Sequence, residues 1–329
     1  MAEPTTPVRS LRGGAGLVVA VAAALVVWAL GTGGSTLLVQ RLVDGATNGV
    51  LYGIVAVALV LVFKATKVIY FAQGSMAMLG AYLAPTLIDA AVPVVLAVLA
   101  AVAVSAVAAA GIERVLIRPF DPADHLPVVI VTLALFLGLN AAVALVWGFS
   151  PRTFPSLFPL GQDAYVDLLG ARLDHADIGT LLVALAVIVV IEVVLRRTRL
   201  GLAFRAVANS VESARLLGIP VGRTVQFSWA LAAAAGTLAA CLIAPTTFLD
   251  PIFMNKILIY AFAAATLGGL DSVGGALAGG VLVGVVISLL EYVPALGGEF
   301  GLGAAFVIIV VVLQVRPAGL WGRRTVERV

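Results

Sequence analysis

The sequence predicts an all-α polytopic membrane protein with about ten transmembrane helices, eight being the lower bound, and with both termini in the cytoplasm. Of its 329 residues, 62% are hydrophobic and only 11% are charged, and the mean hydropathy is +1.15. Soluble domains contain about 45–50% apolar and about 25% charged residues. The chain therefore has too few charges to cover a water-facing surface, and lipid is the solvent that its composition fits.

Uncharged intervals supply the candidate helices, because a helix needs roughly 17–25 residues to cross about 30 Å of hydrocarbon. Ten intervals are candidates, of which the sixth tolerates Glu192 near its end and the eighth and tenth are short: 13–40, 45–63, 68–88, 90–112, 126–151, 178–195, 224–249, 257–270, 272–290 and 300–315. No soluble domain interrupts them, so we expect residues 1–329 to form a single transmembrane domain. The first interval exceeds a signal-peptide core of about 7–15 residues, so we expect 1–33 to be retained as an anchor.

The basic residues are distributed asymmetrically along a path that alternates across the membrane. Lys and Arg are retained on the cytoplasmic side, and four fall outside: Arg41, Arg152, Arg172 and Lys256. The other sixteen fall inside: Arg9, Arg12, Lys64, Lys67, Arg114, Arg118, Arg196, Arg197, Arg199, Arg205, Arg215, Arg223, Arg316, Arg323, Arg324 and Arg328. The distribution predicts a cytoplasmic loop at 196–223 and an irregular, proline-containing external loop at 152–177.

Residues for enzyme chemistry are scarce. The two histidines, His125 and His175, fall in loops on opposite sides of the membrane, and Cys241 is the single cysteine. No lysine has the setting of a phosphate-binding loop. We therefore expect no catalytic residue, no metal, no cofactor and no nucleic-acid partner. An ion-coupled carrier is the rival hypothesis, but such carriers place ionisable groups at mid-depth, where only Asp271 is a candidate.

The cytoplasmic loop 196–223 has a pattern beyond its charge. It carries six arginines against the single Glu212, and its apolar residues follow gaps of four, four, three and three, as on one face of a helix: Ala203, Val207, Val211, Ala214 and Leu217. Asn209 and Glu212 have the spacing of a capping-box variant, and Gly218 before Pro220 is expected to end the helix. The alternative is a purely topogenic loop. The candidate residues for coupling to a partner are Asn209, Glu212, Ala214, Leu217, Gly218 and Ile219.

Two interruptions fall within apolar intervals. Gln73, Gly74 and Ser75 suggest a helix broken beside an aqueous path, since Gln is costly in lipid without a partner; a packed interface of small residues is the alternative. The second lies within 257–290, which is about 50 Å long as one helix, too long for one crossing and short for two. A kinked or re-entrant pair around 268–275 resolves this, with Asp271 at its cytoplasmic tip.

Small residues recur at gaps of four in this second segment: Gly268, Ser272, Ala276, Gly280 and Gly284. Such a strip lets helices pack closely, which is a more common role than transport chemistry. Asn48 and Asn140 lie in or beside apolar intervals, and hydrogen bonding to a neighbouring helix is the alternative role for each. The candidate residues of a substrate path are Asn48, Gln73, Gly74, Ser75, Asn140, Gly268, Gly269 and Ser272.

Three segments together resemble the LivH-type permease subunit of branched-chain amino acid ABC importers. They are NGVLYGIVAVALVLVFKATKVIYFAQGSMAMLGAY at 48–82, RTRLGLAFRAVANSVESARLLGI at 197–219 and AATLGGLDSVGGALAGGVLVGVVISLLE at 264–291. The sequence departs from the family pattern at Tyr70, Ser75, Asp271 and Gly274. These departures leave open a related permease for urea, amides or aromatic acids.

The resemblance implies a non-enzymatic translocation subunit in the bacterial plasma membrane. Its implied partners are two cytoplasmic ATPase subunits, a second related permease or a second copy of this chain, and an extracytoplasmic solute-binding protein. The ATPases would act on 196–223, and the spans would rock to alternate access.

Overall fold

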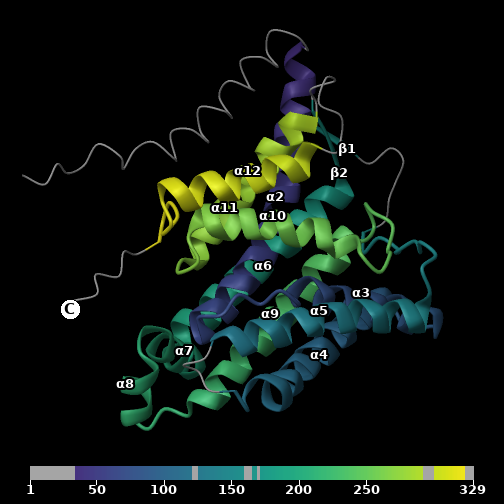
Figure 1. The fold of residues 1–329 in the computed structure, drawn as a ribbon. Coiled ribbons are helices and arrows are strands. Elements are labelled where there is room, and N and C mark those ends of the chain that lie inside the picture. The colour runs from purple at the N-terminus through teal and green to yellow at the C-terminus, as the bar shows by residue number, and fades with distance from the viewer. Residues whose placement is uncertain (1–33, 121–124, 159–164, 169–170, 292–299, 323–329) are drawn as a thin grey trace, which may run out of the picture.

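The computed structural model describes residues 34–120, 125–158, 165–168, 171–291 and 300–322, and these are almost entirely helical (Figure 1). The helices of the apolar intervals are α2 (Gly34–Thr66), α3 (Gln73–Asp89), α4 (Val94–Ile112) with its π-helical extension η2 (Glu113–Ile117), α5 (His125–Trp147), α6 (His175–Arg197), α9 (Val221–Ile243), α10 (Phe253–Gly268), α11 (Val273–Glu291) and α12 (Phe300–Val315). Two shorter helices, α7 (Arg199–Asn209) and α8 (Val211–Leu216), lie between α6 and α9.

Among the described residues, six helical segments are long and apolar enough to cross a membrane: α2, α4 with η2, α5, α6, α9 and α11. Helices α10 and α12 are apolar but shorter, and α3 has 17 residues. The prediction of a multi-pass helical membrane protein is thus confirmed. The count of ten spans and the cytoplasmic termini stay predictions, and residues 1–33 lie outside the described residues.

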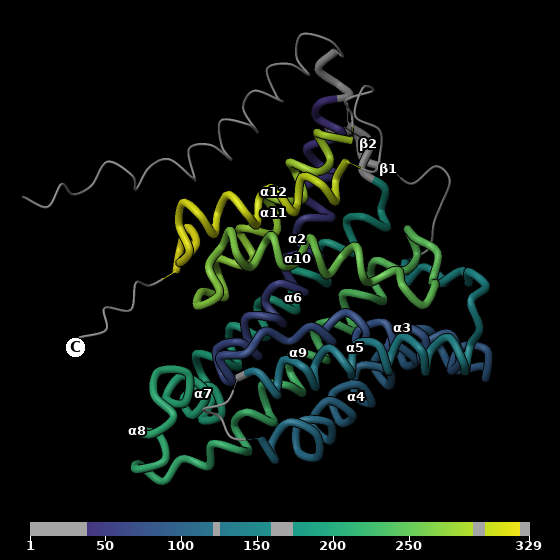
Figure 2. The backbone as a smooth tube through the Cα atoms, in the orientation of Figure 1, coloured from purple at the N-terminus to yellow at the C-terminus, as the bar shows by residue number. Residues whose placement is uncertain are grey.

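Helix α2 is the centre of the arrangement. It contacts α9, α10 and α11. Figure 2 shows α10, α11 and α12 in the upper part of the view and α3, α4, α5 and α9 in the lower part, with α2 running from one part to the other. The other helices therefore pack around α2, whose long apolar run after Asn48 is largely buried.

The expected boundary between the first two spans, near residues 41–44, is wrong. Helix α2 runs without interruption from Gly34 to Thr66, so Arg41 and Asp44 lie within it. The Gln40 amide donates a hydrogen bond to the Asp44 carboxylate at 2.8 Å, four residues along the same helix. Charged residues do not break a helix by themselves, and no proline is present to do so.

Glycines bring α2 and α11 into backbone contact. A Cβ atom on Gly280 would lie 2.4 Å from Gly53 Cα, and one on Gly284 would lie 2.4 Å from Gly49 Cα. Such distances exclude any side chain, so the helices approach through their small residues. The packing role of the small-residue strip is confirmed for this part of it.

The break expected around 268–275 is confirmed. Helix α10 ends at Gly268, α11 begins at Val273, and the two helices pack against each other. Gly269 in the turn has a φ of 103°, a conformation that favours glycine. Lys67 Nζ lies 3.6 Å from Asp271 Oδ1, which places this turn beside the end of α2.

The expectation of an irregular loop over 152–177 is wrong in part. Strands β1 (Tyr165–Leu168) and β2 (Ala171–Asp174) pair antiparallel, with Tyr165 opposite Asp174. Apolar and polar residues partly alternate in both segments, a pattern that is typical of strands. Helix α6 then begins at His175, inside the expected loop.

Candidate functional site

Helices α7 and α8 stand at one end of the bundle, away from the β1–β2 hairpin (Figure 1). The expected cap at Asn209 is wrong, because Asn209 is the last residue of α7. The cap is Ser210, whose hydroxyl accepts a hydrogen bond from Ser213 N at 3.2 Å. The backbone is extended at Ser210, with φ −156° and ψ 117°, so it divides the expected single helix into two.

The predicted end of the helix at Gly218 is confirmed. Gly218 N donates to Arg215 O and Ile219 N donates to Ala214 O, each at 3.0 Å. Gly218 has a φ of 74°. This is a Schellman ending, in which a left-handed glycine lets two amides satisfy the last carbonyls. It fixes the direction in which the chain leaves α8 toward Pro220 and α9.

The predicted apolar stripe divides between buried and exposed positions. Val207 and Ala214 are buried. Leu217, expected on the same face, is instead 78% exposed, and its neighbour Leu216 is 89% exposed, because the chain turns at Ser210 and again at Leu217. Two leucines are therefore presented at the tip of the segment.

The start of α7 is fixed to α6. The Thr198 hydroxyl accepts from Gly201 N at 3.0 Å and donates to Val194 O at 2.6 Å. A Cβ atom on Gly201 would lie 2.3 Å from Leu195 O. These close contacts fix the angle between α6 and α7.

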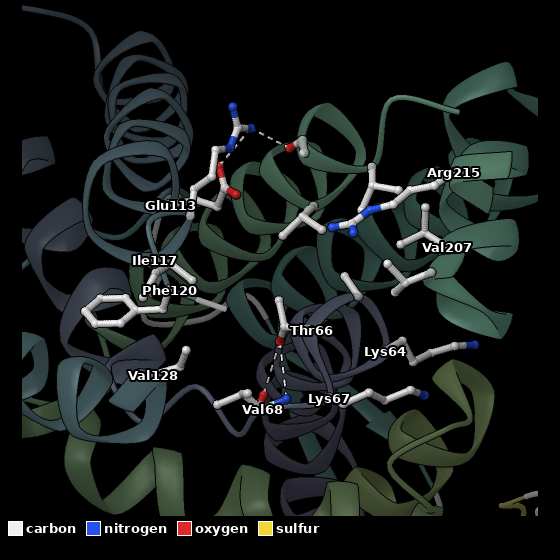
Figure 3. A pocket seen from close by; sticks show the side chains of 16 residues that line it. Lys64, Thr66, Lys67, Val68, Glu113, Ile117, Phe120, Val128, Val207 and Arg215 are labelled. Carbon is white, nitrogen blue, oxygen red and sulfur yellow. Dashed lines mark hydrogen bonds and ion pairs between the residues drawn. The ribbon is translucent and has the colours of Figure 1, made fainter. Parts of the chain in front are cut away.

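A basic pocket of about 260 Å³ lies between this segment and the rest of the bundle (Figure 3). Its charged lining is mostly basic, with one acid: Lys64, Lys67, Arg118, Arg215 and Glu113. Its apolar lining includes Val68, Ile117, Phe120, Val128, Val207, Val211 and Val225. The pocket brings together α2, η2, α5, α7, α8 and α9, so movement of any of them changes its shape.

Glu113 in this pocket was not singled out by the sequence. It is 2% exposed and lies 3.4 Å from Arg118 Nη2, and the same nitrogen donates to Gly222 O at 2.7 Å. Gln226 also donates to Ala110 O at 3.0 Å. Together these bonds tie α4 and η2 to the start of α9. The signal available in the sequence was an acid five residues before a base beside a long apolar run.

The predicted interruption near Gln73 is present, but its position differs. The chain leaves helical geometry after Thr66 and α3 begins at Gln73, so Gln73, Gly74 and Ser75 form the first turn of a helix. Gln73 is fully buried and its Nε2 donates to Ala232 O on α9 at 2.9 Å. The start of α3 is therefore fastened to α9.

Two of the predicted path residues, Ser75 and Asn140, are in contact. The Ser75 hydroxyl lies 2.9 Å from Asn140 Oδ1 and 3.3 Å from Phe136 O. Ser75 is buried, so the pair joins α3 to α5 inside the bundle. The expected alternative for Asn140, a hydrogen bond to a neighbouring helix, is what the structure shows.

The other predicted path residues separate. Gly268, Gly269 and Ser272 lie in the α10–α11 turn, where the Ser272 hydroxyl accepts from Gly275 N at 3.0 Å. Asn48 lies near the middle of α2, exposed in a second cavity.

This second cavity, the mixed-charge cavity, has a volume of about 380 Å³ and lies between α2, α6, α10, α11 and the end of α9. Its charged lining residues are Arg41, Asp44, Asp177, Lys256 and Glu291. They are scattered over 250 positions of the sequence, which is why pattern analysis did not group them. Among the described residues, no group of His, Cys, Asp or Glu could hold a metal ion.

The fold defines a multi-pass helical membrane protein. Residues 41–315 match the family described as the permease component of branched-chain amino acid transport systems, and the chain belongs to this family.

The similarity to known proteins extends over most of this chain and most of each relative. The chain is 30% identical to the high-affinity branched-chain amino acid transport permease BraD of Pseudomonas aeruginosa, over 88% of this chain and 97% of the relative. It is 28% identical to LivH of Escherichia coli K12, with the same coverage. It is 29% identical to a probable LivH of Methanocaldococcus jannaschii, over 82% and 88%.

Proposed function

We propose that this chain is the translocating subunit of an ATP-driven importer of branched-chain amino acids in the bacterial plasma membrane. Its family membership carries the proposal, supported by relatives whose names state this transport. Two cytoplasmic ATPase subunits, a second permease and an extracytoplasmic binding protein complete the importer. The second permease is a related chain or a second copy of this one.

ATP hydrolysis by the partner subunits is coupled to transport through α8. Leu216 and Leu217 offer an exposed apolar surface that a groove on an ATPase can bury, in the manner of a helix in a groove. The Schellman ending at Gly218 transmits the position of α8 to α9, which contacts α2, α3 and α4. Asn209, Glu212, Ala214 and Ile219 flank this contact.

The substrate path follows polar groups that movements of α9 and α5 would rearrange. Gln73 and Ser75 bond to α9 and α5, so a shift of either helix would release buried polar groups to water or substrate. Gly74 keeps α3 close to α10, because a Cβ atom there would lie 3.3 Å from the Leu258 side chain. A hydrogen-bonded polar group that exchanges partners is a suitable element for alternating access.

Coupling is tested by exchanging one residue in two ways. In Gly218→Val the left-handed position costs about 1–2 kcal/mol and α8 loses its ending, whereas Gly218→Asn tolerates the same φ. In the reconstituted importer, we expect Gly218→Val to uncouple ATP hydrolysis from leucine uptake and Gly218→Asn to retain coupling. Normal coupling in both variants would remove α8 from the mechanism.

The ATPase contact is tested separately with exposed leucines. Leu216→Ser should weaken ATPase binding without destabilising the permease, because the side chain is 89% exposed. Leu202→Ser on α7 is the matched control, since Leu202 is 62% exposed away from the tip. Co-purification of the ATPases with each variant measures the difference, and equal loss from both would contradict the assignment.

Orientation is tested by cysteine labelling. Cys241 is free and buried, so it is first replaced by Ala. In intact cells, Ser156→Cys should react with an impermeant thiol reagent and Ser213→Cys should not. The reverse pattern would overturn the cytoplasmic placement of 196–223.

A further inference from the structure

We propose that the mixed-charge cavity binds a zwitterion, namely a single free amino acid received from the binding protein. Its carboxylate would face Lys256 and Arg41, and its ammonium would face Asp44, Asp177 and Glu291. This inference rests on the proposed transport function and deepens it, because it assigns a substrate-binding site on the permease itself.

The cavity concentrates charge of both signs in a chain that has little charge. Two cations and three carboxylates line it, and none of the three ion pairs found among the described residues joins any of these five. Asp44 accepts a hydrogen bond from Gln40. Charged groups within or at the ends of membrane helices are costly and mark functional positions. Opposite charges that share a cavity without pairing suit a ligand that carries both charges.

A buried hydroxyl in the cavity wall also lacks a partner. Tyr260 is only 2% exposed, lines the cavity, and its hydroxyl has no hydrogen-bond partner among the described residues. Lys256 Nζ lies 5.7 Å from the centroid of its ring, and the Tyr52 ring lies 5.1 Å away. An unsatisfied buried hydroxyl is unfavourable, and a polar ligand would satisfy it.

The remaining lining suits a branched apolar side chain. Ile243, Phe253, Ile257 and Ile287 line the cavity and are themselves mostly buried. The volume of about 380 Å³ lies in the range of about 300–1,000 Å³ usual for small-ligand sites, which combine apolar walls with a few placed polar groups. A cavity lined by charged groups of both signs and by aliphatic side chains suits leucine, isoleucine or valine, which carry two charges and a branched apolar side chain.

A simple ion fits this lining less well. The acids do not form a group able to hold a metal among the described residues, and the two basic side chains would repel a cation. Three carboxylates would repel a simple anion in turn. The arrangement therefore favours a ligand with both charges over a ligand with one.

The site is tested by asking whether leucine protects a cysteine in the cavity from a thiol reagent. The importer is assembled in nanodiscs without its binding protein. Thr247 is exposed and lines the cavity, so Thr247→Cys in a Cys241→Ala background reports on its occupancy. Leucine should slow its reaction with a small thiol reagent. Isoamylamine, which lacks the carboxylate, and 4-methylvalerate, which lacks the ammonium, should protect at least about tenfold more weakly. Thr153→Cys, exposed but outside the cavity lining, should not respond to leucine.

Variants then assign the carboxylate partner. In the Thr247→Cys background, Lys256→Gln should raise the leucine concentration for half-protection by about tenfold, and Lys256→Arg should restore it. Lys67→Gln, a lysine in the other pocket, is the matched control and should leave protection unchanged.

Two results would overturn the site. One is equal protection by leucine, isoamylamine and 4-methylvalerate; the other is no protection by leucine in an importer that takes up leucine normally. ATP-driven leucine uptake with the binding protein is measured on the same preparation. Its absence counts against the proposed function, whereas intact uptake without protection counts against this site alone.

Discussion

The basic pocket lies at the end of α2 and the mixed-charge cavity lies beside its first half and middle, and the two are built in different ways. The basic pocket gathers Lys64, Lys67, Arg118 and Arg215 around one buried acid, and that acid is paired. The mixed-charge cavity holds both signs of charge without an ion pair among its described lining residues. Paired and capped groups favour a fixed geometry, whereas unpaired groups remain available to a ligand.

The two sites also differ in what holds their walls. Near the basic pocket, α7 and α8 are set by local caps at Thr198, Ser210 and Gly218. The walls of the mixed-charge cavity depend on the contact between α2 and α11, whose glycines allow backbone approach. Substitutions should therefore affect the two sites separately.

The largest expected effect is at the glycine contact. In Gly284→Ala, the new Cβ would lie 2.3 Å from Gly45 O and 2.4 Å from Gly49 Cα, so α2 and α11 must separate. Overpacking of this kind costs about 1–3 kcal/mol. We expect a lower thermal unfolding midpoint and loss of leucine uptake. Gly274→Ala on the same helix is the control, because a Cβ there meets no atom within 4 Å; equal effects of the two would contradict the packing argument.

A slightly smaller loss of stability is expected when the buried Glu113 loses its partner. Arg118→Met removes the partner of Glu113 and the donor to Gly222 O. A lost partner of a buried polar group costs about 1–3 kcal/mol, and the lower part of this range applies because Arg118 is partly exposed. Arg196→Met, which removes the exposed pair with Glu192, should cost less than about 1 kcal/mol. The thermal unfolding midpoints of the two purified variants measure the difference. An equal shift of both midpoints would show that burial of Glu113 is unimportant.

Gln73→Leu should act on transport more than on stability. It removes the hydrogen bond to Ala232 O, typically worth about 0.5–1.5 kcal/mol, while the apolar replacement retains most of the volume. We expect normal assembly with reduced leucine uptake by the reconstituted importer. Unchanged uptake at equal expression would leave Gln73 with a packing role only.

The smallest effect is expected at the tip of the α10–α11 turn. Lys67 and Asp271 form an ion pair at 3.6 Å, but their side chains are 50% and 41% exposed. Exposed pairs contribute about 0–1 kcal/mol. Asp271→Asn should therefore shift the thermal midpoint little, and the shift should shrink further at high salt. A large, salt-independent loss of stability would show that this turn is a structural support of α2.

Several local features were predictable because they depend on neighbours in the sequence. The apolar intervals predicted nine of the helices, Gly218 predicted the end of α8, and the length of 257–290 predicted the α10–α11 turn around 268–275. Where local signals competed, the prediction failed: Asn and Ser are both good caps, and only the backbone geometry at Ser210 shows that Ser210 rather than Asn209 is used.

The sequence by itself determined that this protein is a helical membrane protein and where most of its helices lie, because hydrophobicity and helix-breaking residues act locally. It also supplied the family resemblance. Only the tertiary structure decided that α2 is continuous through Arg41 and Asp44, that Gln73 meets Ala232, and that Glu113 is paired. It alone assembled the mixed-charge cavity, because distant residues meet only when the helices pack, and periodicity along one helix carries no information about its neighbours.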